Sequence, residues 1–228
     1  MGMTQHAWRG IFFDLDGTLV DSEGVCLDTL ATFASESHIE LSKSELDWLR
    51  SATWDLCFDN LLANHSISLT CESLRSLIFN RLIALYQESP PPLMSGAQSA
   101  FFTAKEVASV GIVTSSPSIL VKPLLSAHPV LATTQILITD DDVNSQKPSS
   151  EPYLVAAKRL DILPQDCIVF EDTPVGVQSA AQAGMCTCVV GELAQSSLSF
   201  ISISSLAEVS VAWLHSLRQK WLNTLEYL

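Results

Sequence analysis

Short apolar runs alternate with longer amphipathic stretches along much of the chain. The apolar runs have the length and β-favouring composition of buried strands, and the amphipathic stretches repeat with the period of a helix. This alternation predicts an α/β fold built on a doubly wound parallel sheet, that is, a Rossmann-like core. The expected strands are residues 11–13, 110–114, 135–139, 167–170 and 187–190, and the expected helices are residues 97–109, 118–126, 151–160 and 175–183.

A different pattern separates the first two expected strands. Residues 22–90 show helical periodicity, most clearly across 42–65 and 71–88, and three consecutive prolines starting at Pro90 end the segment. We therefore expect an inserted helical cap domain at residues 22–90. The core is then made of residues 1–21 and 91–228.

The remaining segments carry weaker local signals. Ser42 or Ser44 is suited to cap the middle helix of the insert. Residues 195–205 are rich in serine and are expected to form a loop. Residues 206–228 are amphipathic and are expected to form a helix that packs on the core.

Charge and cysteine content exclude several classes of function. The 228 residues carry a formal net charge of −13, which disfavours nucleic acid and anionic membranes as partners. The six cysteines show no disulfide framework, and Cys186 and Cys188 lie in an apolar run typical of a core. No basic-then-apolar leader precedes the first strand, and no apolar run approaches the roughly 18 residues of a membrane span. We expect a cytoplasmic protein; its oligomeric state cannot be read from the sequence, although a monomer is favoured.

Two aspartates stand where the first expected strand ends. Asp14 and Asp16 directly follow residues 11–13, and Gly17 lets the chain turn there. The carboxyl end of a parallel strand is where such sheets bind ligands, and side chains two residues apart point to the same side. Two carboxylates held in this way suit Mg²⁺, and they can also divide the roles of nucleophile and general acid/base. The alternative is an ordinary Asp-Gly turn.

Hydroxyls and a lysine follow two later strands. Thr114 and Ser115 end a strand, where hydroxyls and free backbone N–H groups can hold a phosphoryl oxygen, although a helix cap is the alternative. Lys147 follows a loop rich in aspartate and is fixed by Pro148. Most lysines are simply solvated, but a site with several carboxylates and a phosphate needs a cation.

Two acids end a further expected strand. Asp172 follows residues 167–170 and, together with Asp14 and the backbone carbonyl of Asp16, would complete a magnesium site. Asp172 could instead cap the next helix. Glu171 lies beside it and is expected to support the site without binding substrate.

The string Asp-Leu-Asp-Gly-Thr-Leu-Val-Asp-Ser-Glu, residues 14–23, resembles the first motif of the haloacid dehalogenase-like hydrolases, in particular their phosphatase branch. Thr114, Lys147-Pro148 and the segment 170–185 resemble the second, third and fourth motifs. The resemblance implies that Asp14 attacks phosphorus and that Asp16 transfers the proton. It implies further that Thr114, Ser115 and Lys147 hold the phosphoryl group and that Mg²⁺ is the cofactor.

The position of the insert identifies the branch of the family. Asp14 and Thr114 are 100 residues apart, so the cap follows the first motif, as in members resembling β-phosphoglucomutase. Cys26 replaces the histidine of mutase-like members, and Trp54 replaces a cap arginine, so the cap lacks the expected cation for a second phosphate. These departures favour a Mg²⁺-dependent phosphomonoester hydrolase of a small phosphorylated metabolite. Residues 138–143 and 151–154 favour a sugar or polyol phosphate. A phosphosugar mutase and a non-catalytic phosphate-binding regulatory protein are the alternatives.

Overall fold

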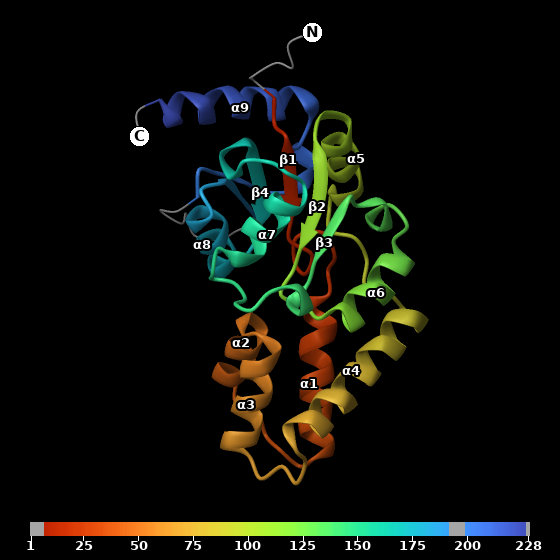
Figure 1. Cartoon of the computed structure of the whole chain (residues 1–228). Helices are drawn as coiled ribbons and strands as arrows, with labels where there is room; N and C mark the ends of the chain where they lie inside the picture. Colours follow the sequence, from red (N-terminus) through yellow and green to blue (C-terminus); the bar gives the residue numbers. More distant parts are fainter. Residues whose placement is uncertain (1–6, 192–198, 227–228) are drawn as a thin grey trace.

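The computed structural model describes residues 7–191 and 199–226. Within these residues the core is a six-stranded parallel sheet with the strand order β3-β2-β1-β4-β5-β6 (Figure 1). The expected α/β architecture is confirmed, and β1 lies in the middle of the sheet between β2 and β4. The strands are β1 (Gly10–Phe13), β2 (Ser109–Val113), β3 (Ile136–Ile138), β4 (Cys167–Glu171), β5 (Cys186–Val190) and β6 (Ile201–Ile203).

Helices cover both faces of the sheet, and the alternation of side chains along β1 gives each face its own core. Ile11 and Phe13 point into one core, whereas Phe12 points into the other. The first core contains α5 (Ala97–Val107), α6 (Ser118–Ala127) and α9 (Val211–Leu225). The second contains α7 (Glu151–Arg159) and α8 (Pro174–Gln182). The strands are buried on both sides, which is why they are almost entirely apolar.

A helical cap stands beyond the carboxyl ends of the strands (Figure 1). Its helices are α1 (Glu23–Glu36), α2 (Lys43–Ser51), α3 (Trp54–Asn64) and α4 (Cys71–Glu88). Ser42 caps α2, as one of the two serines was predicted to do: its hydroxyl accepts from the Glu45 N–H while the Glu45 carboxylate accepts from the Ser42 N–H. The inserted helical cap is thus confirmed, while the division of the chain at residues 22 and 90 stays a prediction.

Two chain segments join the cap to the core, and they run side by side. We call residues 19–21 and 92–94 together the neck. The Asp21 N–H donates to the Pro92 carbonyl at 2.9 Å, and the Met94 N–H donates to the Leu19 carbonyl at 2.9 Å. Val20 and Leu93 form an antiparallel bridge between them. The segment that leads into the cap and the segment that leads out of it are therefore hydrogen-bonded to each other.

The structure differs from the sequence-based expectations at three places. The stretch 42–65 is two helices, because Ala52 and Thr53 are extended and separate α2 from α3. Residues 195–205 were expected to be a loop, but β6 lies within them as a three-residue edge strand; residues 192–198 lie outside the described part. The final helix is α9, preceded by a short 3₁₀ turn at Leu206–Glu208, and residues 227–228 lie outside the described part.

The thiols and the hydropathy of the helices can also be compared with the sequence in the described residues. All six cysteines are free thiols, and Cys186 and Cys188 are fully buried in β5. No described helix combines the length and apolar character needed to cross a lipid bilayer.

Candidate active site

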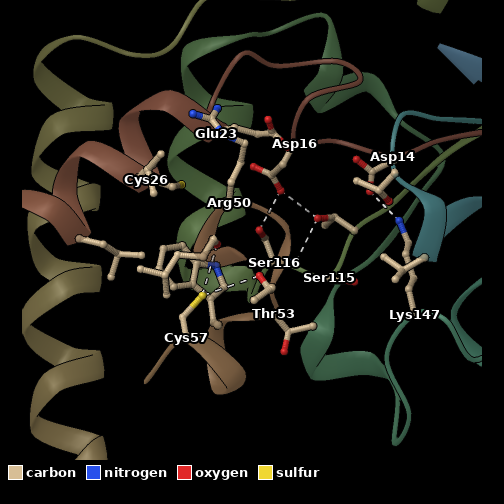
Figure 2. A pocket seen from close by; sticks show the side chains of 18 residues that line it. Asp14, Asp16, Glu23, Cys26, Arg50, Thr53, Cys57, Ser115, Ser116 and Lys147 are labelled. Atoms are coloured by element: carbon tan, nitrogen blue, oxygen red, sulfur yellow. Dashed lines mark hydrogen bonds and ion pairs between the residues drawn. The ribbon is translucent and has the colours of Figure 1, made fainter. Parts of the chain in front are cut away.

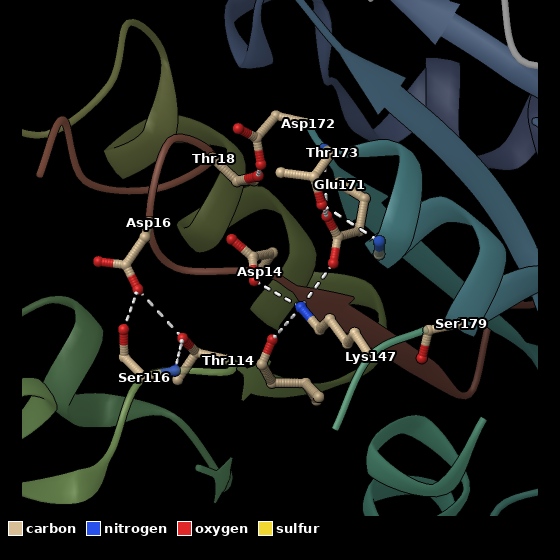
Figure 3. A network of polar contacts seen from close by, with 12 residues as sticks. Asp14, Asp16, Thr18, Thr114, Ser116, Lys147, Glu171, Asp172, Thr173 and Ser179 are labelled. Atoms are coloured by element: carbon tan, nitrogen blue, oxygen red, sulfur yellow. Dashed lines mark hydrogen bonds and ion pairs between the residues drawn. The ribbon is translucent and has the colours of Figure 1, made fainter. Parts of the chain in front are cut away.

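The strand ends bring the predicted site residues together, as Figure 3 shows. Asp14 continues β1 by one residue, with its N–H donating to the Phe170 carbonyl of β4 at 3.0 Å. Thr114 continues β2 in the same way, donating to the Ile138 carbonyl of β3 at 2.9 Å. The parallel register therefore carries both side chains, and those that follow β4, to one edge of the sheet.

Lys147 lies at the centre of this group of acids. Its Nζ donates to Asp14 Oδ1 and Glu171 Oε1, each at 2.5 Å, and to the Val113 carbonyl at 3.0 Å. Burial alone would lower the pKa of Lys147, but the carboxylates of Asp14 and Glu171 outweigh it and raise that pKa above its ordinary value. The side chain, only 4 % exposed, is therefore a fixed cation and not a solvated surface lysine.

Three carboxylates form a group suited to a metal ion. One oxygen each of Asp14, Glu171 and Asp172 lies within 4.8 Å of the others. Burial raises the pKa of Asp14 well above its ordinary value although Lys147 opposes this. Burial, followed by the charge of Glu171, raises the pKa of Asp172 to about 7. When ionised, the three carboxylates carry more negative charge than the single ammonium of Lys147 balances, and the raised pKa values reflect the cost of that charge in a buried site. A hard divalent cation with oxygen ligands fits that deficit.

Asp172 is not the cap of the following helix. Thr173 caps α8, its hydroxyl accepting from the Gly176 N–H, so the Asp172 carboxylate faces the site and accepts from Thr18 Oγ1 at 2.7 Å. Gly17 makes this approach possible: its φ is +82°, and a Cβ there would lie 2.2 Å from Asp172 Oδ2. The turn after β1 and the end of β4 therefore fit together only with glycine at position 17.

The Asp16 carboxylate has different neighbours from that of Asp14. Three hydroxyls donate to it: Ser22 Oγ at 2.5 Å, Thr114 Oγ1 at 3.1 Å and Ser116 Oγ at 2.7 Å. Thr114 was predicted to lie in the site, but the hydrogen bonds from Ser22 and Ser116 were not foreseen. Ser22 belongs to the string 14–23 and Ser116 directly follows Ser115, so their proximity to the motifs was the available signal. Ser115 lines the cavity beside them.

Glu171 is held in place from three sides. In addition to Lys147, Tyr153 of α7 donates its hydroxyl to Glu171 Oε1 at 2.7 Å, and Thr173 Oγ1 donates to Oε2 at 3.2 Å. On α8, a Cβ at Gly176 would lie 2.0 Å from this carboxylate, so glycine leaves the space that Glu171 fills. The structure therefore places Glu171 in the acidic group itself, next to both Asp14 and Lys147.

We expect Tyr153→Phe to lower the free energy of unfolding by about 1.5–3 kcal/mol, because it removes a buried hydrogen bond to a carboxylate. Urea unfolding in the presence of EDTA measures this. Tyr86→Phe is the matched control: it removes a buried hydroxyl whose partner is the neutral Cys26 thiol, 3.2 Å away, and should cost only about 1 kcal/mol. Equal costs for the two variants would contradict this account of Glu171.

A cavity lies between the core and the cap (Figure 2). The core lines it with Asp14, Asp16, Thr114, Ser115, Ser116 and Lys147. The cap lines the other side largely with apolar side chains, among them Leu27, Leu30 and Trp54, where Trp54 also packs against Phe58 and Phe79. Arg50 of α2 lines the cavity as well. The sequence analysis considered only the position of Trp54 and so missed this cation.

Similar proteins share this architecture. The sequence profile of the family described as haloacid dehalogenase-like hydrolase matches residues 11–190. The chain is 31% identical over 183 residues to Validoxylamine A 7'-phosphate phosphatase from Streptomyces hygroscopicus subsp. limoneus, covering 78% of this chain and 83% of that protein. It is 28% identical over 204 residues to Phosphoglycolate phosphatase from Escherichia coli (strain K12), covering 77% and 78%. The structure of CbbY from Rhodobacter sphaeroides in complex with phosphate has the same fold, with a TM-score of 0.81, 22% identity and coverage of 90% and 98%.

Proposed function

The chain belongs to the haloacid dehalogenase-like hydrolase family, and we propose that it is a Mg²⁺-dependent phosphomonoester hydrolase of a small metabolite, with a sugar or polyol phosphate favoured. Both of the relatives above are phosphatases of small phosphorylated compounds. The observation that carries the proposal is the different surroundings of the two carboxylates after β1. Asp14 is bound to Lys147, whereas Asp16 is bound to hydroxyls and lines the cavity toward the cap.

These surroundings support a division of labour between the two aspartates. Asp14 attacks phosphorus, so that a bond from its carboxylate oxygen to phosphorus forms as the bond to the departing alcohol oxygen breaks. Asp16 gives its proton to that oxygen. A water molecule then attacks the aspartyl-phosphate, Asp16 takes the proton of that water, and Asp14 is released with free phosphate. The hydroxyls around Asp16 fix its orientation through both proton transfers.

The remaining residues bind the phosphoryl group and the ion. Thr114, Ser115 and Lys147 hold the phosphoryl oxygens, which need positive charge and hydrogen-bond donors as negative charge develops. Asp14, Asp172 and the backbone carbonyl of Asp16 would hold Mg²⁺, with Glu171 beside them. When bound, the ion supplies charge that offsets the repulsion between the carboxylates and the phosphate.

We expect EDTA to lower phosphate release from p-nitrophenyl phosphate by at least about 100-fold and added Mg²⁺ to restore it, since a divalent ion typically contributes several kcal/mol at such a site. Asp172→Asn should raise the Mg²⁺ concentration for half-maximal activity by about tenfold or more. Asp47→Asn, at an exposed position of α2, is the control for the loss of one charge. Phosphate release that is indifferent to EDTA would refute the metal requirement. A protein that binds phosphate without releasing any from esters would be a binder and not an enzyme.

The residue at position 26 favours hydrolysis over a mutase reaction. Cys26 lines the cavity, its sulfur lies 3.2 Å from the Tyr86 hydroxyl, and burial raises the pKa of its thiol to about 12. A thiol in that state cannot exchange protons near neutral pH as an imidazole does. A hexose 1-phosphate converted to the 6-phosphate faster than to free phosphate would support the mutase instead.

A further inference from the structure

The two sides of the cavity differ in polarity. The phosphoryl side is polar and belongs to the core, as described above. The cap side is lined mainly by apolar side chains, namely Leu27 and Leu30 of α1 and Trp54 and Cys57 of α3. Figure 2 shows the cap residues Cys26 and Cys57 on the side of the cavity away from Lys147. The departing alcohol must therefore lie partly against apolar surface.

Two charged side chains interrupt this apolar surface. Glu23 of α1 and Arg50 of α2 both line the cavity, and Figure 2 shows them together beside Asp16. Their electrostatic influence on each other is consistent with this placement: burial raises the pKa of Glu23, and the charge of Arg50 opposes the rise. The cap therefore presents a donor and an acceptor side by side, with little net charge.

An anionic leaving group fits this arrangement poorly. A carboxylate or second phosphate placed near Arg50 would also lie near Glu23, whose negative charge opposes it and cancels the attraction of the guanidinium. In a partly buried cavity, repulsion between the anionic group of the ester and the Glu23 carboxylate should lower the affinity for that ester by several-fold or more. A neutral hydroxyl, in contrast, can accept from the guanidinium and donate to the carboxylate.

We propose that Glu23 and Arg50 select phosphate esters of uncharged, hydroxyl-bearing alcohols, whose carbon face packs on Leu27, Leu30 and Trp54, and reject esters whose alcohol carries a carboxylate or second phosphate. This inference rests on the proposed phosphatase activity and assigns two specificity residues to it. The two relatives named above differ in this respect, because glycolate carries a carboxylate. Glu23 and Arg50 favour an ester whose departing alcohol carries no charge.

The test uses two ligands that differ only at the group in question. Glycerol 3-phosphate and 3-phosphoglycerate have the same carbon chain and end in a CH₂OH and a carboxylate, respectively. Each competes against p-nitrophenyl phosphate at pH 8 with saturating Mg²⁺, and its inhibition constant is measured. We expect glycerol 3-phosphate to bind at least about tenfold more tightly.

The selectivity is the inhibition constant of 3-phosphoglycerate divided by that of glycerol 3-phosphate. Charge variants of Glu23 and Arg50 should change this ratio in opposite directions. Glu23→Gln removes the repelling charge and should reduce the ratio about fivefold or more, chiefly by tightening 3-phosphoglycerate. Arg50→Gln should weaken both ligands and widen the ratio. Glu72→Gln, which removes the same charge from an exposed position of α4, should leave the ratio unchanged. A general loss of structure would not produce opposite shifts.

The outcomes separate this inference from the function on which it rests. If the wild type does not hydrolyse p-nitrophenyl phosphate with Mg²⁺, the proposed phosphatase activity fails, and the inference fails with it. If it does, tighter binding of 3-phosphoglycerate, no competition by either ligand, or a ratio insensitive to Glu23→Gln overturns the selection of neutral alcohols alone.

Discussion

Asp14→Asn should remove nearly all turnover, lowering kcat for p-nitrophenyl phosphate by about 10⁴-fold or more, as loss of an enzyme nucleophile typically does. The amide keeps the shape of the side chain and one acceptor oxygen for Lys147, but it cannot form an acyl phosphate. Because Asp14 directly follows the central strand β1, circular dichroism and thermal unfolding should be recorded for the same sample, so that loss of activity is not mistaken for loss of fold.

Asp59→Asn provides the matched control, since Asp59 is exposed on α3 and does not line the cavity. It removes one carboxylate charge from the cap and should leave kcat within about twofold, as for most surface substitutions. Near-wild-type turnover by Asp14→Asn would refute the covalent route. The lone carboxylate of Asp16 would then have to activate water directly.

Lys147→Ala is expected to lower kcat/KM by about 100-fold or more, because a preorganised charge facing the phosphoryl group is lost. Its ammonium contacts Asp14 and Glu171 in the buried group, and no other basic side chain of the described residues contacts either carboxylate. Arg9, the other basic residue close to a core motif, lies at the amino end of β1, where its N–H donates to the Asp166 carbonyl.

Lys147→Arg should recover only part of this loss. A planar guanidinium is larger than an ammonium and cannot donate to Asp14, Glu171 and the Val113 carbonyl from one point. Lys158→Ala on the exposed side of α7 is the control for loss of a positive charge. Activity of Lys147→Ala within about threefold of the wild type would mean that another group supplies the charge.

Most of the site residues that could be predicted from the sequence stand at or next to the end of an apolar run. Asp14, Thr114 and Asp172 each end an apolar run, and parallel strands end at one edge, so their convergence follows from the strand pattern alone. Lys147 is different: most lysines are solvated, and it was singled out by the aspartate-rich loop before it, by Pro148 after it and by the motif resemblance.

Two of the site residues that the sequence analysis missed lie on helices outside the motifs and contact the site only in the folded chain. Tyr153 of α7 donates to Glu171, and Arg50 lines the cavity from the last turn of α2, just before the break at Ala52 and Thr53. Apolar periodicity across 42–65 could not reveal that break, since both helices bury one side. In the same way β6 has three residues and one buried side chain, too little alternation to stand out from a serine-rich loop.

The neck joins the cap to the core through two adjacent chain segments, so we expect that the cap could be replaced as a unit. The Asp21 N–H donates to the Pro92 carbonyl, so the cap helices begin and end at adjacent points of the chain. We expect that they could be exchanged without altering the path of any described strand, provided that Ser22, whose hydroxyl binds Asp16, is kept. The groups that act on phosphorus are all anchored on the core side of that connection, whereas Glu23, Arg50 and Trp54 lie beyond it. Recombination at two adjacent peptide segments would thus give the same chemistry a new choice of alcohol, which is a short evolutionary route from one phosphate ester to another.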